Sequence, residues 1–150
     1  MKDIEFLEKH CHILNRSFEE YFEKPLCEFV DCHPIYIDLD NSNSVIVSHG
    51  LGSDPIFNYA NKNALDLFEM SWSDFTSLPS RYSAETPEQE ERESFLKEVS
   101  NKGYSSSYSG VRISKSGKRF AINDAKVWNL FDSDGKAYGQ AATFDNWEYL

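Results

Sequence analysis

Apolar side chains recur at alternating steps of three and four along residues 3–22, at Ile4, Leu7, Cys11, Leu14, Phe18 and Tyr21. A helix turns once in about 3.6 residues, so this spacing gathers them on one helical face. Asp3 can cap the first turn, and Pro25 ends the segment. The pattern predicts an amphipathic helix whose apolar face packs either on its own sheet or against a second copy of the chain.

A connector over residues 23–43 separates this helix from a pair of short strands. Within it, we expect residues 34–39 to be extended. Residues 44–48 (SVIVS) and 56–59 (IFNY) have the β-branched and aromatic composition of half-buried strands, with a glycine-containing turn between them. These two runs predict a β-hairpin.

Three helices are predicted after this hairpin, each from a residue whose short side-chain oxygen can accept a first-turn N–H. The capping candidates are Asn61 or Asn63 for residues 62–69, Ser71 or Ser73 for a short helical turn, and Thr86 for a long helix. Pro87 suits the first helical position after Thr86, and Gly103 suits the end of the long helix.

Three strands are predicted at the end of the chain, over residues 104–114, 118–131 and 138–144. Ser-Gly and Asp-Gly pairs provide the two hairpin turns between them. The apolar alternation changes parity at Gly110, which predicts a β-bulge there.

This order of elements predicts an α+β fold with one antiparallel sheet. Two strands, several helices and a three-stranded meander follow one another in the order of the PAS domain. We therefore expect a PAS-like five-stranded antiparallel sheet covered by helices on one face, preceded by the N-terminal amphipathic helix.

Four longer blocks resemble the MEKHLA domain family, a PAS-like family: SHG…DPIFNYAN, LPSRYSAE, YSGVRISKSGKRF and VWNLFDSDGKAYGQAATF. The resemblance extends over about residues 10–147. It implies a stand-alone sensory, ligand-binding or signalling module whose ligand is not generally established. On this basis, residues 1–43 are an N-terminal helix and connector, residues 44–147 are the PAS-like MEKHLA domain, and residues 148–150 are a tail.

The net charge of −10 argues against direct binding to nucleic acid or to anionic membranes, because such binding requires many Lys and Arg side chains. No apolar run is long enough to span a membrane. The three cysteines are odd in number and irregularly spaced, which is typical of reduced thiols and indicates a cytoplasmic protein.

Cofactor signals are weak. No cysteine occurs in the LPSRYSAE block, where a light-sensing PAS domain carries its reactive one, so a covalent flavin adduct is not expected. Haem is disfavoured because the long helix contains no histidine and His49 suits a turn. His10 and His12 diverge on a helix, so we expect no metal site, a buried Cys11 and surface histidines.

A catalytic alternative uses Ser48 as nucleophile with His49, Asp54 and Tyr59. Ser48 and His49 are neighbours on a predicted strand and should point to opposite faces, which disfavours a triad. A non-catalytic module is therefore the main prediction, and a small enzyme that uses the same pocket is the alternative.

The predicted ligand pocket lies between the inner face of the sheet and the helices. It would bind a small organic molecule of unknown identity, and core packing without a cavity is the competing interpretation. Its candidate lining residues are Asn58, Tyr59, Phe75, Arg81, Tyr82, Ser83, Phe95, Tyr108, Ile113, Phe120, Ile122, Trp128, Asn129, Gln140, Ala142 and Phe144. An interaction module is a further possibility, with a homodimer formed through the N-terminal helix.

Overall fold

Helix α1 (Ile4–Phe22) forms where the apolar spacing predicts it, in a computed structural model that describes residues 3–150. The Asp3 side chain accepts hydrogen bonds from two N–H groups of the first turn, as a cap should. Helix α2 (Ile35–Asp40) follows, so the extended run predicted over residues 34–39 is wrong. Its β-branched residues favour a strand locally, but burial of Leu39 beneath α1 stabilises the helical form.

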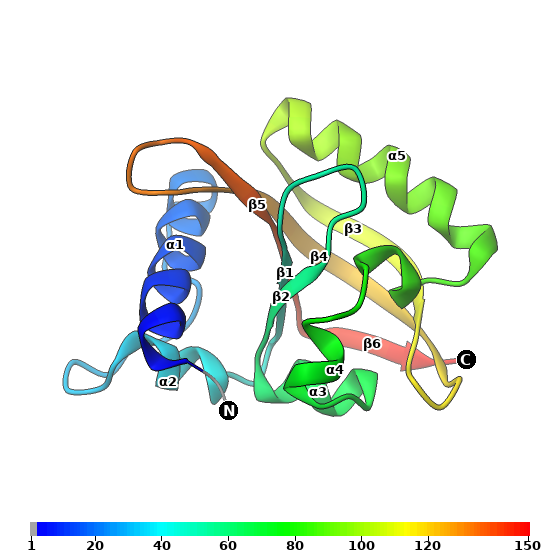
Figure 1. Cartoon of the computed structure of the whole chain (residues 1–150), viewed down its shortest axis with the longest axis horizontal. Helices are drawn as coiled ribbons and strands as arrows, with labels where there is room; N and C mark the ends of the chain where they lie inside the picture. The colour runs from blue at the N-terminus through cyan, green and yellow to red at the C-terminus, as the bar shows by residue number, and fades with distance from the viewer. Residues whose placement is uncertain (1–2) are drawn as a thin grey trace.

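All strands belong to one antiparallel sheet (Figure 1). They are β1 (Val45–His49), β2 (Phe57–Ala60), β3 (Tyr104–Ile113), β4 (Arg119–Phe131) and β5 (Ala137–Phe144), in the spatial order β2-β1-β5-β4-β3. A short β6 (Asn146–Tyr149) pairs with the first half of β4, beside the end of β5. The predicted PAS-like antiparallel sheet is thus confirmed, and β6 adds a strand to it.

Helices α3 (Lys62–Phe68), α4 (Trp72–Phe75) and α5 (Thr86–Lys102), with a 3-10 turn at Ser80–Ser83, cover one face of the sheet. Asn61 and Ser71 cap α3 and α4, as predicted. The cap predicted for α5 is wrong by one residue, because Glu85 occupies that position and its side chain makes no capping bond.

Helix α1 lies on the opposite face of the sheet from α5 (Figure 1). The apolar face of α1 packs on side chains from the adjacent face of the sheet. Leu14 and Phe18 on this helical face are 0% and 2% exposed. The apolar face of α1 is therefore used within its own chain, which decides between the two packings that the sequence left open.

Strand β4 contains an irregularity that sets which side chains face α1 and which face α5. Tyr108 pairs with Ala125 and Gly110 with Ile122, so three steps along β4 match two along β3. The register shift predicted beside Gly110 is present, but the extra residue lies in β4, where Asp124 has a φ of 54°. Beyond this bulge, Val127 faces α5 and Trp128 faces α1.

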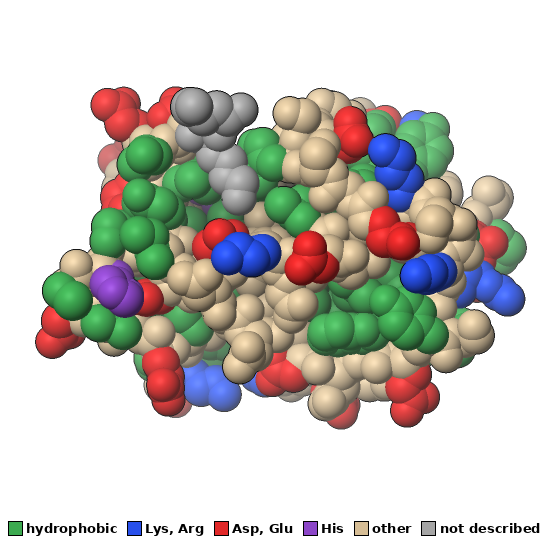
Figure 2. Space-filling view, turned by 90° about the horizontal axis from the view of Figure 1, so that it is seen from below, with side chains coloured by type: hydrophobic (Ala, Val, Ile, Leu, Met, Phe, Trp, Pro, Cys, Tyr) green, Lys and Arg blue, Asp and Glu red, His purple; other side chains and the backbone are tan. Residues whose placement is uncertain are grey.

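The surface contains charges of both signs. Figure 2 shows acidic and basic side chains interspersed between apolar patches on the face seen from below. Among residues 3–150, no helix combines the length and the apolar character that a bilayer crossing requires.

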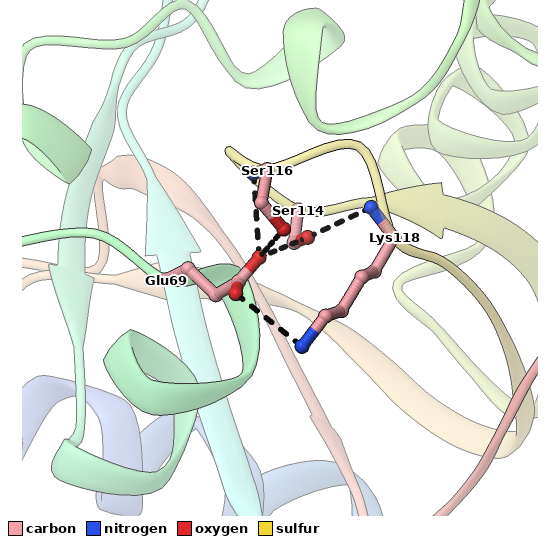
Figure 3. Close-up of polar contacts among 4 residues, drawn as sticks. All are labelled: Glu69, Ser114, Ser116 and Lys118. Atoms are coloured by element: carbon pink, nitrogen blue, oxygen red, sulfur yellow. Dashed lines mark hydrogen bonds and ion pairs between the residues drawn. The ribbon is translucent and has the colours of Figure 1, made fainter.

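Glu69 joins the end of α3 to the β3–β4 hairpin (Figure 3). Its Oε1 accepts hydrogen bonds from the hydroxyl groups of Ser114 and Ser116 and from the Ser116 N–H. Lys118 Nζ lies 3.7 Å from its Oε2. These hydrogen bonds, led by that of Ser114, lower the pKa of Glu69 to about 2.

We expect Glu69→Gln to lower the urea midpoint of unfolding at neutral pH, because the amide keeps an acceptor but loses the charge. The depressed pKa means that this stabilisation exists above pH 4.5 and disappears as the pH falls towards about 2. Urea titrations across this range should show the two proteins converging. Glu98→Gln, on the exposed side of α5, is the matched control and should not change the midpoint. A constant difference at all pH values would contradict the assignment.

Candidate functional site

A small cavity of about 60 Å³ lies between α5 and the inner faces of β1, β3, β4 and β5. Most of its wall is apolar and comes from strand residues that alternate towards the helices. The apolar lining includes Val47, Phe57, Phe68, Phe95, Leu96, Ile122, Ala125, Val127, Ala142 and Phe144. The polar lining comes from a few side chains that converge on the same space, which is typical of a small-molecule site.

Helix α5 presents an arginine on its buried face. Arg92, Phe95, Leu96 and Val99 recur at helical spacing, and Arg92 is only 8% exposed. Phe95 stacks on Tyr108 with ring centroids 3.9 Å apart. The helix therefore brings a guanidinium group and an aromatic ring to the cavity together.

Strand β3 supplies a second buried arginine. Arg112 Nη2 donates to the Tyr108 hydroxyl at 2.8 Å, and Nη1 donates to the Val111 carbonyl at 2.9 Å. Tyr108, Gly110 and Arg112 alternate along the strand, so both side chains meet over the glycine. A Cβ at Gly110 would lie 2.5 Å from the Tyr108 hydroxyl oxygen, so any other residue there would have to displace the Tyr108 side chain.

His49 adds an unpaired acceptor to the wall. Its Nδ1 lies 2.9 Å from the Gly50 carbonyl, which only accepts, so Nδ1 carries the proton. Its Nε2 is buried and has no hydrogen-bond partner among the described residues. Burial lowers the pKa of His49 to about 4, so the ring is neutral at neutral pH and Nε2 presents a lone pair.

The two arginines place positive charge in an apolar setting. Burial, and then the neighbouring Arg112, lower the pKa of Arg92 to about 10, which leaves Arg92 charged at neutral pH. Four other basic side chains of the described chain form ion pairs with carboxylates: Arg81, Lys115, Lys118 and Arg119. Within residues 3–150, no carboxylate oxygen lies within 4.0 Å of Arg92 or Arg112.

Seven of the side chains predicted for the pocket line this cavity: Ser83, Phe95, Tyr108, Ile122, Gln140, Ala142 and Phe144. Gln140 and Asn129 each donate to backbone carbonyls of α5, and Gln140 also donates to the Asn129 side-chain oxygen, so the two amides fasten the helix to the sheet. Phe75 and Phe120 are buried in the same core away from the cavity, and Ile113 is partly buried near the end of β3.

The remaining candidates lie elsewhere. Tyr59 and Trp128 pack on the α1 side of the sheet. Asn58 accepts a hydrogen bond from Ser48, also on that side. Arg81 pairs with Asp54 at 3.0 Å, and Tyr82 is 49% exposed.

Histidine 10 forms the nearest approach to a nucleophile–base pair, with Nε2 2.8 Å from the Ser48 hydroxyl oxygen. His10, on the buried face of α1, and Ser48 of β1 are 0% and 1% exposed, so this pair is shielded from solvent. The prediction of a surface His10 is therefore wrong. His49 makes no hydrogen bond with the Ser48 hydroxyl, so these two residues do not form the nucleophile–base pair of the catalytic alternative.

The sequence reasoning missed Arg92 and Arg112. Arg92 has a signal, because it continues the apolar face of Phe95 and Val99 one turn earlier. Arg112 has a weaker one, as the third member of the Tyr108–Gly110–Arg112 alternation. Charged residues at such positions are buried only when a particular fold encloses them, so neither signal is sufficient alone.

Sequence comparison decides the family. The sequence model of the MEKHLA domain matches residues 8–149. The chain belongs to the MEKHLA domain family. The matched region includes nearly all of α1 and all of the sheet, and no curated protein matches the chain with significance.

Solved structures similar to this MEKHLA domain are PAS and light-oxygen-voltage domains. A PAS domain from Colwellia psychrerythraea has a TM-score of 0.61 at 17% identity, over 74% of this chain and 89% of that one. A light-oxygen-voltage domain studied with a flavin analogue has a TM-score of 0.61 at 13% sequence identity. The match covers 79% of this chain and 86% of that one. The light-state dimer of the fungal photoreceptor Vivid has a TM-score of 0.59 at 12% sequence identity. The match covers 95% of this chain and 93% of that one. At such identities the likeness shows the fold alone.

The cavity of this MEKHLA domain does not fit a flavin. Pockets for ligands of that size have volumes of about 300–1,000 Å³, whereas this one has about 60 Å³. None of the three cysteines lines it: Cys11 is on the buried face of α1, and Cys27 and Cys32 precede β1. No flavin chemistry is therefore assigned to these residues.

Proposed function

We propose that this MEKHLA domain is a non-catalytic sensory module that binds a small organic ligand in the cavity between α5 and the sheet. The observation that carries the proposal is an apolar cavity with a few polar side chains on its wall, Arg92, Arg112 and His49. Sites of this kind bind ligands through apolar contact and fix their orientation through few hydrogen bonds. The PAS and light-oxygen-voltage neighbours support a sensory role at the level of the fold.

A route for the signal follows from the alternation of the strands. Val127 and Ala142 contact the cavity, and their neighbours Trp128 and Ala141 pack in the cluster that contains α1, with Ala141 also on the cavity wall. A ligand that displaces β4 or β5 would thus change the surface on which α1 rests. Packed interiors transmit such shifts because they deform little. In this proposal α1 is the element that reports occupancy to a partner.

Filling the cavity tests the proposal. Ala125→Val adds methyl groups to the cavity wall, and it should abolish the stabilisation that a bound compound gives to the wild type. The measurement is the melting temperature across a panel of small organic acids, amines and neutral polar compounds. Ala121→Val, a partly buried position in β4 outside the cavity lining, is the matched control and should keep the response.

The panel also separates this proposal from the enzyme alternative. A compound that stabilises the wild type should be recovered chemically unchanged after prolonged incubation with it. Recovery of a converted product would favour the small enzyme. A panel in which no compound raises the wild-type melting temperature would contradict ligand binding.

The homodimer and the cytoplasmic location stay predictions of this article. Since the apolar face of α1 packs on its own sheet, a dimer would use another surface, and Tyr149 and Leu150 of the C-terminal segment are 59% and 68% exposed. Light scattering on the purified chain measures its molar mass and thus its oligomeric state. A monomer at all concentrations would contradict the homodimer.

A further inference from the structure

We propose that the ligand is a short-chain carboxylic acid that bears a hydroxyl group, held through its carboxylate by Arg92 and Arg112. This inference rests on the proposed function, because it names the ligand class of the same cavity. It is argued from the charge of the site, from its hydrogen-bond donors, from its volume and from the free nitrogen of His49.

The charge of the site calls for an anion. Two arginines, each 8% exposed over the whole residue, line one cavity of a chain whose net charge is −10. Burying a charge is costly unless an opposite charge or sufficient hydrogen bonds compensate it. An acidic protein has many carboxylates to offer, yet within the described part of the chain none pairs with either arginine.

The nearby acids do not replace the missing anion. Glu91 Oε2 lies 3.5 Å from the Tyr108 hydroxyl, so it reaches Arg112 only through that group. Glu88 lies one turn before Arg92, and its Oε2 is buried with no hydrogen-bond partner among the described residues. Glu93 acts on Arg92 only as a weak neighbouring charge.

The donors of the two arginines are largely free. A guanidinium group carries five N–H donors in a fixed fork that suits two carboxylate oxygens. Arg112 commits Nη1 and Nη2 contacts to Val111 and Tyr108, which leaves its other N–H groups available. Arg92 makes no hydrogen bond to any residue between 3 and 150.

The volume limits the body of the ligand. An engineered apolar cavity of about 150 Å³ holds benzene, and a water occupies about 30 Å³ in the liquid. A cavity of about 60 Å³ therefore suits an acid of about two to four carbon atoms. Its carbon chain would contact the apolar wall formed by Val47, Ile122 and Ala142.

The unpaired Nε2 of His49 favours a ligand that can donate a hydrogen bond to it. Nε2 is an acceptor in a neutral ring, it is buried, and no described residue donates to it. A buried acceptor without a donor is destabilising, because it has lost its hydrogen bonds to water and gained none in return. A hydroxyl group next to the carboxylate satisfies it, so 2-hydroxypropanoate (lactate) should bind better than propanoate.

Calorimetric titration of the full chain with lactate, propanoate and inorganic phosphate tests the inference. We expect lactate to bind about tenfold more tightly than propanoate, and phosphate to give no saturable signal. Arg92→Gln and Arg112→Gln should each weaken lactate binding at least about tenfold. Arg119→Gln removes an exposed arginine paired with Glu85 and should bind lactate as the wild type does.

Folding of the variants is checked independently. Arg92→Gln and Arg112→Gln should each keep the wild-type circular dichroism spectrum. Arg92→Gln removes a desolvated and unpaired charge, so it should melt at the same or a higher temperature without ligand, whereas Arg112→Gln also loses the hydrogen bonds to Tyr108 and Val111. Arg112→Lys keeps the charge but loses the fork, and it should also bind lactate weakly if two-point contact is required. Unchanged lactate binding in folded Arg92→Gln and Arg112→Gln would overturn the assignment.

The outcomes also separate this inference from the proposed function. If neutral compounds stabilise the wild type but not Ala125→Val, and lactate does not bind, the pocket binds a ligand and the anion assignment is wrong. If phosphate binds as tightly as lactate, the site is a general anion site and the short-chain acid is wrong. If Glu88→Gln is required before lactate binds, Glu88 is the counter-ion and the inference is also wrong.

Discussion

Acidification from pH 6.5 to about pH 4 should remove a large part of the free energy of unfolding. His10 and His49 are both buried, and burial lowers the pKa of each from 6.5 to about 4. In the unfolded chain both take up protons near pH 6.5, whereas in the folded chain both stay neutral. Each histidine therefore costs about 3 kcal/mol of stability across this range.

The sign of this effect follows from the depressed pKa values. Stability from the two neutral rings is fully present above pH 6.5 and is lost as the pH falls towards 4. Together the losses are about 6 kcal/mol, comparable with the whole stability of many domains of about 5–15 kcal/mol. The folded chain should then be much less stable at pH 4 than at pH 6.5, and protonation of Glu69 removes further stability below that value.

The hydrogen bonds of His10 explain why its neutral form is required. Asn58 Oδ1 accepts the Ser48 hydroxyl proton, so Ser48 accepts from His10 Nε2, and His10 Nδ1 accepts from the Tyr138 hydroxyl at 3.1 Å. A proton on Nδ1 would reverse the last bond. The neutral ring satisfies every member of this buried chain.

Urea unfolding at a series of pH values measures this loss. His10→Gln removes one of the two titrating groups, so its stability should fall about half as steeply as that of the wild type between pH 6.5 and 4. His12→Gln, in an exposed position of the same helix, is the control and should keep the wild-type slope. A wild-type stability that is flat over this range would show that the histidines are not buried as described.

Trp128→Ala should destabilise the fold by about 3–5 kcal/mol. Trp128 is fully buried, packs edge-on against Phe18 and Phe22 of α1, and donates its indole N–H to the Leu14 carbonyl at 3.3 Å. Its loss leaves a cavity between β4 and α1 that neither element can close. The free energy of urea unfolding at neutral pH gives the magnitude.

Trp147→Ala provides the comparison, because it removes the same side chain from a partly buried site in β6. We expect a loss of about 1 kcal/mol there. Cys11, fully buried on the inner face of α1, gives a local readout, since its thiol should react faster with an alkylating reagent when α1 loosens in Trp128→Ala. Equal losses in the two tryptophan variants would show that α1 does not depend on Trp128.

Local patterns predicted most of the elements correctly. The helix of residues 4–22 follows from three-four spacing, and the caps at Asn61 and Ser71 follow from short polar side chains before apolar runs. The final three strands follow from alternation and turn chemistry. These features depend on neighbours within a few residues, which is the range that sequence alone reports.

The arrangement of the pocket was less accessible to the sequence. One extra residue at Asp124 reverses the faces of β4 beyond it, so Trp128 lies opposite the side that a regular strand extending from Ile122 would give. Residues 34–39 have strand-forming side chains but are helical, because α1 covers Leu39. Both outcomes depend on a partner element distant in sequence.

The sequence by itself determined that this chain is an α+β MEKHLA domain with a PAS-like sheet and an amphipathic first helix, because periodicity, turn residues and family motifs are local properties. Only the tertiary structure decided that α1 packs on its own sheet and that Arg92, Arg112 and His49 meet at one cavity. Whether a side chain is buried depends on the element that packs against it, and that element can be distant in sequence. For that reason the charge and the free nitrogen of this site emerge only when α5, β1 and β3 are brought together.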